Sequence, residues 1–277
     1  MHKPVTRWQA FLIHLGISLI IFLVLAWLIV RIWYPFPYFS HDGGWQGIRI
    51  IAGVDLVLGP LLTLIVYKPG KPRLKMDLGI IAMLQASALA WGVWITWQER
   101  PVAIVYTLDH FVPVTAGELH QHDRDPASLR RLDPRHQPPH VLLDMPEDID
   151  ARQRLLSRSL ATGIPLYLFT DRYRRIDVAD KASLAALSDD VLRHLRSNAD
   201  TRALLARFRE SGAGRAEDYL FIPLYARDGR IVLVLDRQTR DTVDIIRADV
   251  SDYLKSRLPR GLRPSLGREA ARPAQPV

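Results

Sequence analysis

Apolar residues gather in three long runs in the first third of the chain. The runs are Ala10–Val30 (21 residues), Ile50–Tyr67 (18 residues) and Leu78–Trp97 (20 residues). Each is long enough to cross a hydrocarbon layer of about 30 Å as a helix. We therefore expect three transmembrane helices, at about residues 10–32, 48–67 and 78–97. The rival interpretation of the second run is a buried helix of a soluble protein.

The pattern changes after the third run. A strand is expected at 102–106, followed by a second at 111–114. Residues 115–140 are polar and proline-bearing, which predicts a loop. Three amphipathic helices should follow, with Ile149, Leu155, Leu156 and Leu160 on the first, Leu184, Leu187, Val191 and Leu195 on the second, and a third capped by Asp200.

Short alternating or apolar runs close the folded part. Strands are expected at 219–226, 231–236 and 242–246, with a further short strand at 164–169. Pro223 argues for an edge or bulged strand, whereas the apolar run 231–235 argues for burial on both faces. The expected architecture is three transmembrane helices followed by an α+β extracytoplasmic domain with a C-terminal antiparallel β-meander. The domains are 1–97, 98–254 and a disordered Arg/Pro-rich tail, 255–277.

The basic residues indicate an orientation. The chain has 37 Lys and Arg against 29 Asp and Glu, but the excess lies beside the apolar runs and in the tail, which argues against a nucleic-acid partner. Lys3, Arg7 and the Lys/Arg cluster at 68–75 lie on one side of the expected spans. The positive-inside rule then places the N-terminus in the cytoplasm and residues after Trp97 in the periplasm of a bacterial inner membrane.

Several polar or helix-breaking residues lie within the spans. Asp55 needs a hydrogen-bond partner in hydrocarbon. Trp91 of the third span should lie at about the same depth in the membrane, so its indole N–H, or a group of an oligomer partner, is the expected donor. Asp55 could be a structural clamp, a docking point for another helix or part of a proton relay. Pro60 should kink the second span. The candidate intramembrane positions are His14, Asp55, Gly59, Pro60, Thr63, Gln85 and Trp91. Ala82, Ala86 and Ala90 form a small-residue stripe suited to close helix contact.

Candidate chemistry outside the spans is sparse. The chain has no cysteine, which excludes disulfides and thiolate metal sites. One segment combines imidazoles with carboxylates: His120, His122, Asp123, Asp125, His136 and His140. Its spacing fits no metal template, so a solvated loop is the expected state and no metal or cofactor is assigned. Arg172, Arg174 and Arg175 around Tyr173 suggest either a basic patch or a solvated turn.

The residues quoted above resemble one family along nearly the whole chain. The most specific run is Gly53-Val54-Asp55, continuing through Gly59-Pro60 to Thr63, with Gln85 in the third span and Arg100-Pro101-Val102 at the start of the next region. This pattern is similar to that of the type IV pilin accessory proteins, the TfpX/TfpZ group. The segment 120–140 and the tail match no pattern of that family.

The resemblance implies a function. It implies a non-enzymatic inner-membrane protein that binds the major type IV pilin and supports pilus assembly, with membrane lipid as its surroundings. A pilin has an apolar N-terminal helix and a periplasmic head, so a helper with spans and a periplasmic domain could hold both. Two alternatives stay open: a membrane-anchored sensor or ligand- or metal-binding module, and a membrane-bound enzyme.

Overall fold

A computed structural model describes residues 5–40, 44–107, 109–210, 215–226, 229–248 and 250. The predicted tail, 255–277, lies outside the described residues. The chain divides into two compact units, each described here by itself. The first comprises Met1–Ile104, Pro113–His140 and Pro146–Asp171, and the second Val105–Val112, Val141–Met145 and Arg172–Val277.

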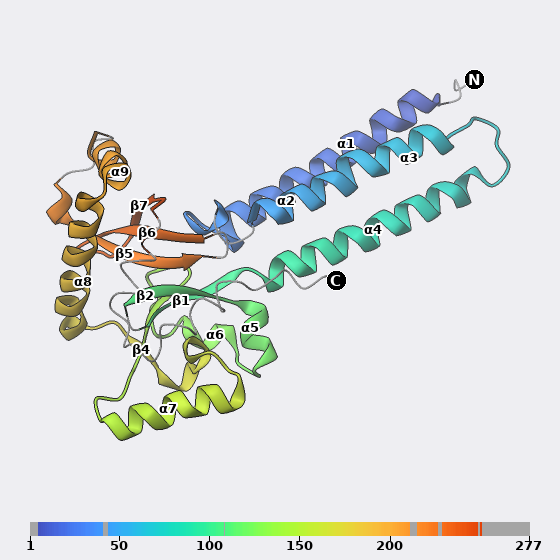
Figure 1. The fold of residues 1–277 in the computed structure, drawn as a ribbon. Helices are drawn as coiled ribbons and strands as arrows, with labels where there is room; N and C mark the ends of the chain where they lie inside the picture. Colours follow the sequence, from blue (N-terminus) through green and yellow to red (C-terminus); the bar gives the residue numbers. More distant parts are fainter. Residues whose placement is uncertain are drawn as a thin grey trace. The chain divides into compact units, whose positions relative to one another are not determined.

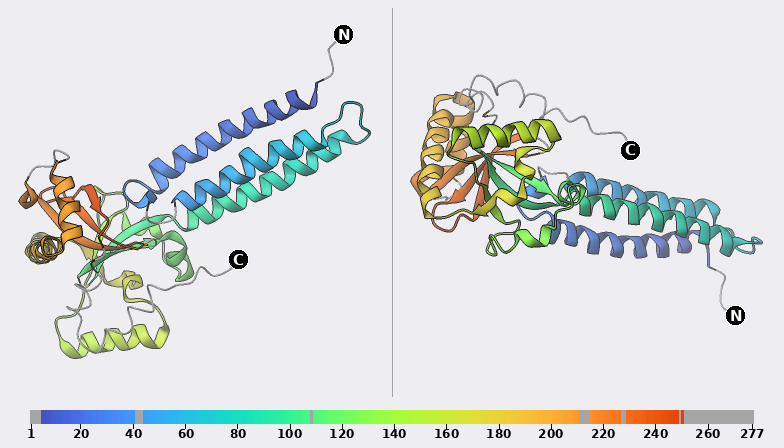
Figure 2. Two further views of the ribbon diagram at one scale, coloured as in Figure 1. Left: turned by 45° about the horizontal axis from the view of Figure 1, so that its top comes forward. Right: turned by 90° about the horizontal axis from the view of Figure 1, so that it is seen from below.

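Three long apolar helices dominate the first unit (Figures 1 and 2). The first span is α1 (Arg7–Leu28), which continues as a π-helical turn, Ile29–Trp33. The second joins α2 (Gly44–Ala52), a π-helical segment (Gly53–Leu58) and α3 (Gly59–Val66). The third is α4 (Leu74–Gln98). All three are long and apolar enough to cross a membrane, which confirms the predicted spans.

Sequence signals explain how these helices begin and pack. Thr6 caps α1 through a reciprocal capping box with Gln9. Helix α4 begins at Leu74, and Asp77 in its first turn pairs with Lys71 at 2.7 Å. Most large apolar side chains of the helices are exposed, as lipid contact requires. Near one end of the bundle, buried Ile29, Tyr34 and Ile51 form a small core.

Residues 115–140 differ from the predicted loop. They contain α5 (Ala116–Gln121), capped by Thr115, and α6 (Pro126–Leu129), capped by Asp125. Leu119 and Leu129 are buried. The prediction of a loop was wrong because two helices of four to six residues are too short to produce a recognisable periodicity.

Helix α7 (Ile149–Thr162) begins at the Asp148 cap and ends at Gly163, whose φ of 67° is left-handed. Only part of the predicted apolar stripe of α7 faces the core. Leu155 is buried, but Ile149 and Leu160 are 69% and 81% exposed. The predicted strand at 164–169 is instead a 3₁₀ turn, Leu166–Leu168, followed by another at Thr170–Arg172.

One mixed sheet carries the α+β part, with the strand order β4-β3-β1-β2-β5-β6-β7 (Figure 1). The fold class is therefore as predicted, although the sheet as a whole is not a simple meander. The strands β5, β6 and β7 pair antiparallel in succession, whereas β2 pairs parallel with β5. The strands are β1 (Pro101–Thr107), β2 (His110–Thr115), β3 (His140–Leu143), β4 (Tyr173–Arg175), β5 (Tyr219–Ala226), β6 (Gly229–Asp236) and β7 (Thr242–Ile246).

The second unit has its core between this sheet and α8 (Val178–Ser197), which precedes α9 (Ala199–Glu210) and a 3₁₀ turn, Ala216–Asp218. Leu184, Leu187, Val191 and Leu195 of α8 are buried, as predicted, and so is all of Ile231–Leu235. Asn198 rather than Asp200 caps α9, since the Asn198 side chain accepts a hydrogen bond from the Asp200 N–H.

Pro223 lies in β5, an internal strand that pairs with β6 in an uninterrupted register, so the prediction of an edge or bulged strand was wrong. The Phe221 N–H donates to Ser188 Oγ of α8 at 2.8 Å rather than to a neighbouring strand. Because backbone groups two residues apart point to the same side of a strand, the nitrogen of Pro223 faces this same side. The missing N–H of proline therefore removes no bond to β6.

Candidate functional site

A polar cluster lies inside the three-helix bundle and joins four of the predicted intramembrane residues, His14, Asp55, Thr63 and Gln85, to Ser18. Gln85 of α4 is its centre. The Gln85 Nε2 group donates to Asp55 Oδ1 in a short bond and to Ser18 Oγ at 3.3 Å. Gln85 Oε1 lies 2.9 Å from His14 Nε2, and His14 Nδ1 lies 2.6 Å from the Thr63 hydroxyl. All three spans therefore contribute to one hydrogen-bonded network.

Asp55 contributes a carboxylate to this network and is 2% exposed. Its Oδ1 accepts from Ser18 Oγ at 3.2 Å as well as from Gln85. Within the part of the chain that the structure describes, no hydrogen-bond partner reaches its second oxygen, Oδ2. The Gln85 amide stands between His14 and Asp55 and has no titratable proton, so the contacts favour the clamp interpretation over a relay.

Gly59 and Pro60 shape the backbone around Asp55. The Gly59 N–H bonds to Val54 O, five residues back, which is the π-helical pattern. In the same pattern the Asp55 carbonyl would accept from residue 60, but proline has no N–H. Gln85 Nε2 donates to this carbonyl instead, at 3.3 Å. A Cβ on Gly59 would overlap the Gln85 amide, so glycine is needed for this close approach.

The prediction that Trp91 donates to Asp55 was wrong. Trp91 is 53% exposed and packs against Trp94 with ring centroids 5.2 Å apart. The depth match failed because the second span begins at Gly44, four residues earlier than expected. At 1.5 Å per residue this places Asp55 about 6 Å deeper. The observed donor, Gln85, lies six residues before Trp91, about 9 Å along α4, so the earlier start of the second span accounts for most of the error.

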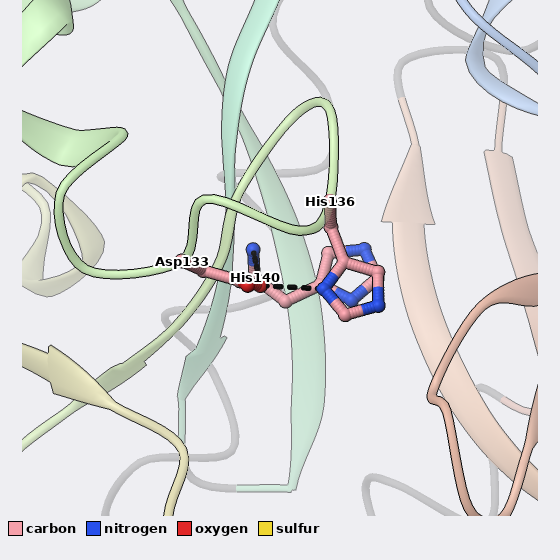
Figure 3. Close-up of side chains that lie close together, drawn as sticks. All are labelled: Asp133, His136 and His140. Carbon is pink, nitrogen blue, oxygen red and sulfur yellow. Dashed lines mark hydrogen bonds and ion pairs between the residues drawn. The ribbon is translucent and has the colours of Figure 1, made fainter.

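A second cluster, formed by Asp133, His136 and His140, lies in the segment that leads into β3 (Figure 3). These residues are 6%, 7% and 4% exposed. Asp133 Oδ2 lies 2.7 Å from His136 Nδ1 and accepts from the His140 backbone N–H at 3.0 Å. The two imidazoles stack with centroids 4.7 Å apart. The prediction of a solvated loop was therefore wrong for this end of the segment.

Hydrogen bonds fix the charge state of Asp133. Burial opposes its ionisation, but the bond from the His136 side chain and those from the His140 and Arg135 backbone hold the pKa of Asp133 below its usual range. Tyr38, from the connection between the first two spans, places its hydroxyl 3.4 Å from His140 Nε2. Asp133 and Tyr38 were not predicted from the sequence, although the three-residue spacing of Asp133 and His136 is a recognisable signal.

The other predicted members of the histidine segment do not join this cluster. His120 stacks on Trp97 and approaches Gln98 Oε1 at 3.2 Å. Asp125 caps α6 by accepting from the Ala127 N–H. Asp123 has a left-handed φ of 53° after α5. These three positions serve local structure.

The segment 172–175, expected to be a basic patch or a solvated turn, forms an ion-pair network. The Arg174 guanidinium donates to both oxygens of Asp180 at 2.7 Å, and Arg172 donates to Asp144 at 3.3 Å. The bond from Arg174 holds the pKa of Asp180 below its usual value, although burial opposes this. The network ties β4 to the first turn of α8.

Comparison with known proteins identifies the family. The sequence profile of fimbrial assembly protein FimB matches residues 3–43. The fimbrial assembly protein of serogroups C1 and C2 from Dichelobacter nodosus is 39% identical over 110 residues, which cover 83% of that protein and 39% of this chain. The chain belongs to the fimbrial assembly protein family.

Two further family members define the extent of the similarity. The Dichelobacter nodosus proteins of serogroups E1 and I are each 39% identical over 110 residues, which cover 42% of each relative. The chain thus matches less than half the length of these two relatives. No solved structure matches the chain. The expected relation to type IV pilus accessory proteins is confirmed at the level of the family.

Proposed function

We propose that this protein is an inner-membrane accessory protein that binds the major type IV pilin and promotes its assembly by binding, without catalysing a reaction. The observation that carries the proposal is its membership of the fimbrial assembly family together with three apolar helices suited to a membrane. The Lys/Arg asymmetry supports a cytoplasmic N-terminus and a periplasmic α+β part.

The exposed face of α4 is the candidate contact for the pilin helix. Ala82, Ala86 and Ala90 are all exposed, although small residues on a membrane helix favour close helix contact. A Cβ added at Gly79, one turn earlier, would meet nothing within 4 Å. The other helices of this chain therefore leave the stripe open. An apolar pilin helix could approach its backbone closely there.

Two weak contacts would combine into a useful affinity. A helper would touch the pilin helix in the membrane and the pilin head in the periplasm. Once one contact has formed, the other forms within the same complex, which raises the effective concentration of its two surfaces. Overexpression of the pilin should then partly replace the helper, because mass action compensates for lost affinity.

Site-specific crosslinking in membranes tests the proposal. A photoreactive residue in place of Ala86 should capture the pilin, and so should one at an exposed position of 219–246. The matched control is Ile20, an equally lipid-accessible position on α1, which is 65% exposed and should capture little. Deletion of the gene should reduce surface pili at unchanged pilin level. Normal piliation in the deletion strain, with no pilin captured from Ala86 or the strands, would refute the proposal.

A further inference from the structure

We propose that Asp133, His136 and His140 form a binding site for one divalent transition-metal ion of the zinc and copper class. Each residue offers one ligand atom, and the three atoms lie within 4.8 Å of one another. All three side chains are buried, and they come from eight consecutive residues of one segment (Figure 3). This site is independent of the proposed pilin function.

The donor set selects the class of metal. Two imidazoles and one carboxylate suit zinc, copper and nickel, whereas calcium and magnesium prefer shells made of oxygen. Zinc binds imidazole nitrogen at about 2.0–2.1 Å, so ligands in a tetrahedral shell lie roughly 3.4 Å apart. The most separated atoms of the cluster need to approach by about 1.4 Å, which side-chain rotation can supply. Water or the Tyr38 hydroxyl, 3.4 Å from His140 Nε2, can complete the shell.

The surrounding hydrogen bonds prepare the carboxylate for a cation. Asp133 Oδ1 accepts from the Arg135 N–H at 3.3 Å, and Oδ2 accepts from the His140 N–H. These bonds orient the carboxylate and favour its anionic form. A bound divalent cation would compensate this buried negative charge directly.

A metal at this position would stabilise a specific contact within the first unit. His140 begins β3, and Tyr38 lies in the 3₁₀ turn, Tyr38–Ser40, between the first two spans. An ion held by the cluster would fix the 133–140 segment beside that turn.

Metal binding by the full-length protein in detergent tests this inference. After removal of adventitious metal with a chelator, equilibrium dialysis against Zn²⁺ should give one zinc per chain. Zinc should raise the thermal midpoint. His140→Ala and His136→Gln should each weaken zinc binding at least tenfold. The matched controls are His120→Ala and His122→Ala, which remove histidines of the same segment outside the cluster and should bind zinc as the wild type does.

Two further measurements keep the inference falsifiable if His140→Ala fails to fold. Co²⁺ bound to the wild type should give the visible absorption of a four-coordinate nitrogen and oxygen site, and Asp133→Asn should weaken it. Absence of stoichiometric zinc in the wild type would overturn the inference. So would loss of zinc in the His120 and His122 variants but not in the His136 variant.

Discussion

Replacement of Gln85 by leucine should destabilise the three-helix bundle more than any other single polar change in α4. The variant loses the Gln85 contacts to Asp55 Oδ1, the Asp55 carbonyl, Ser18 and His14. Interhelical hydrogen bonds in membranes average about 0.6 kcal/mol each, which gives about 2.4 kcal/mol for four. The buried Asp55 carboxylate would keep only the Ser18 hydroxyl as a donor, and this loss of pairing adds about 1–3 kcal/mol. We therefore expect a loss of about 3–5 kcal/mol in the free energy of unfolding.

The assay is equilibrium unfolding in mixed detergent micelles, with Ser87→Leu as the matched control. Ser87 lies two residues further along α4, is exposed, and bonds only to its own helix at Met83 O among the contacts described. Its replacement should change the unfolding free energy by less than about 0.5 kcal/mol. The double variant Asp55→Leu/Gln85→Leu should lose less unfolding free energy than the sum of the two single losses, because it no longer contains the Asp55 carboxylate that lacks its Gln85 donor. Equal losses for Gln85→Leu and Ser87→Leu would refute the reasoning.

Three other predictions concern the helices, the sheet and the topology. Gly59→Ala should destabilise the bundle because its Cβ overlaps the Gln85 amide, whereas Gly53→Ala, with nothing within 4 Å, should be neutral in the same unfolding assay. Asp180 has a lowered pKa in the folded state, so its pairing with Arg174 stabilises the fold above the unfolded-state pKa, and this stabilisation is lost as the pH falls through the lower folded-state pKa. Asp180→Asn should flatten this acid dependence, measured by hydrogen exchange of β4; an unchanged profile would contradict it. Alkaline phosphatase fused after residue 254 should be active, and an active cytoplasmic reporter there would reverse the orientation.

The tertiary structure decided which polar groups meet. The bond from Gln85 to Asp55 joins residues 30 positions apart and depends on where α2 begins and on the π-helical turn at Gly53–Leu58. An error of one turn at a helix end shifts the depth of a side chain by about 5.4 Å. Sequence reasoning could therefore name His14, Thr63 and Gln85 as candidate intramembrane positions, but it assigned Asp55 to the wrong partner.

Nonlocal pairing also decided the sheet and the histidine cluster. The strand β3 follows Gln137-Pro138-Pro139, a sequence typical of loops, and becomes a strand by pairing with β4 some 30 residues later. Entry into that strand buries His140, and Asp133 folds back onto its N–H. Neither event has a periodic signal in the sequence. The parallel pairing of β2 with β5 likewise depends on contacts far apart along the chain.

The sequence by itself determined the features that depend on local composition. The three spans could be predicted from the length of the apolar runs, because a helix in lipid must satisfy its backbone hydrogen bonds internally and present apolar side chains on all sides. The buried run Ile231–Leu235 and the apolar face of α8 followed in the same way, since both are contiguous or periodic patterns. The hydrogen-bond partners of single buried polar groups could not be predicted from the sequence. A hydrogen bond depends on atomic positions to within about half an ångström, and only the packing of the tertiary structure sets those positions.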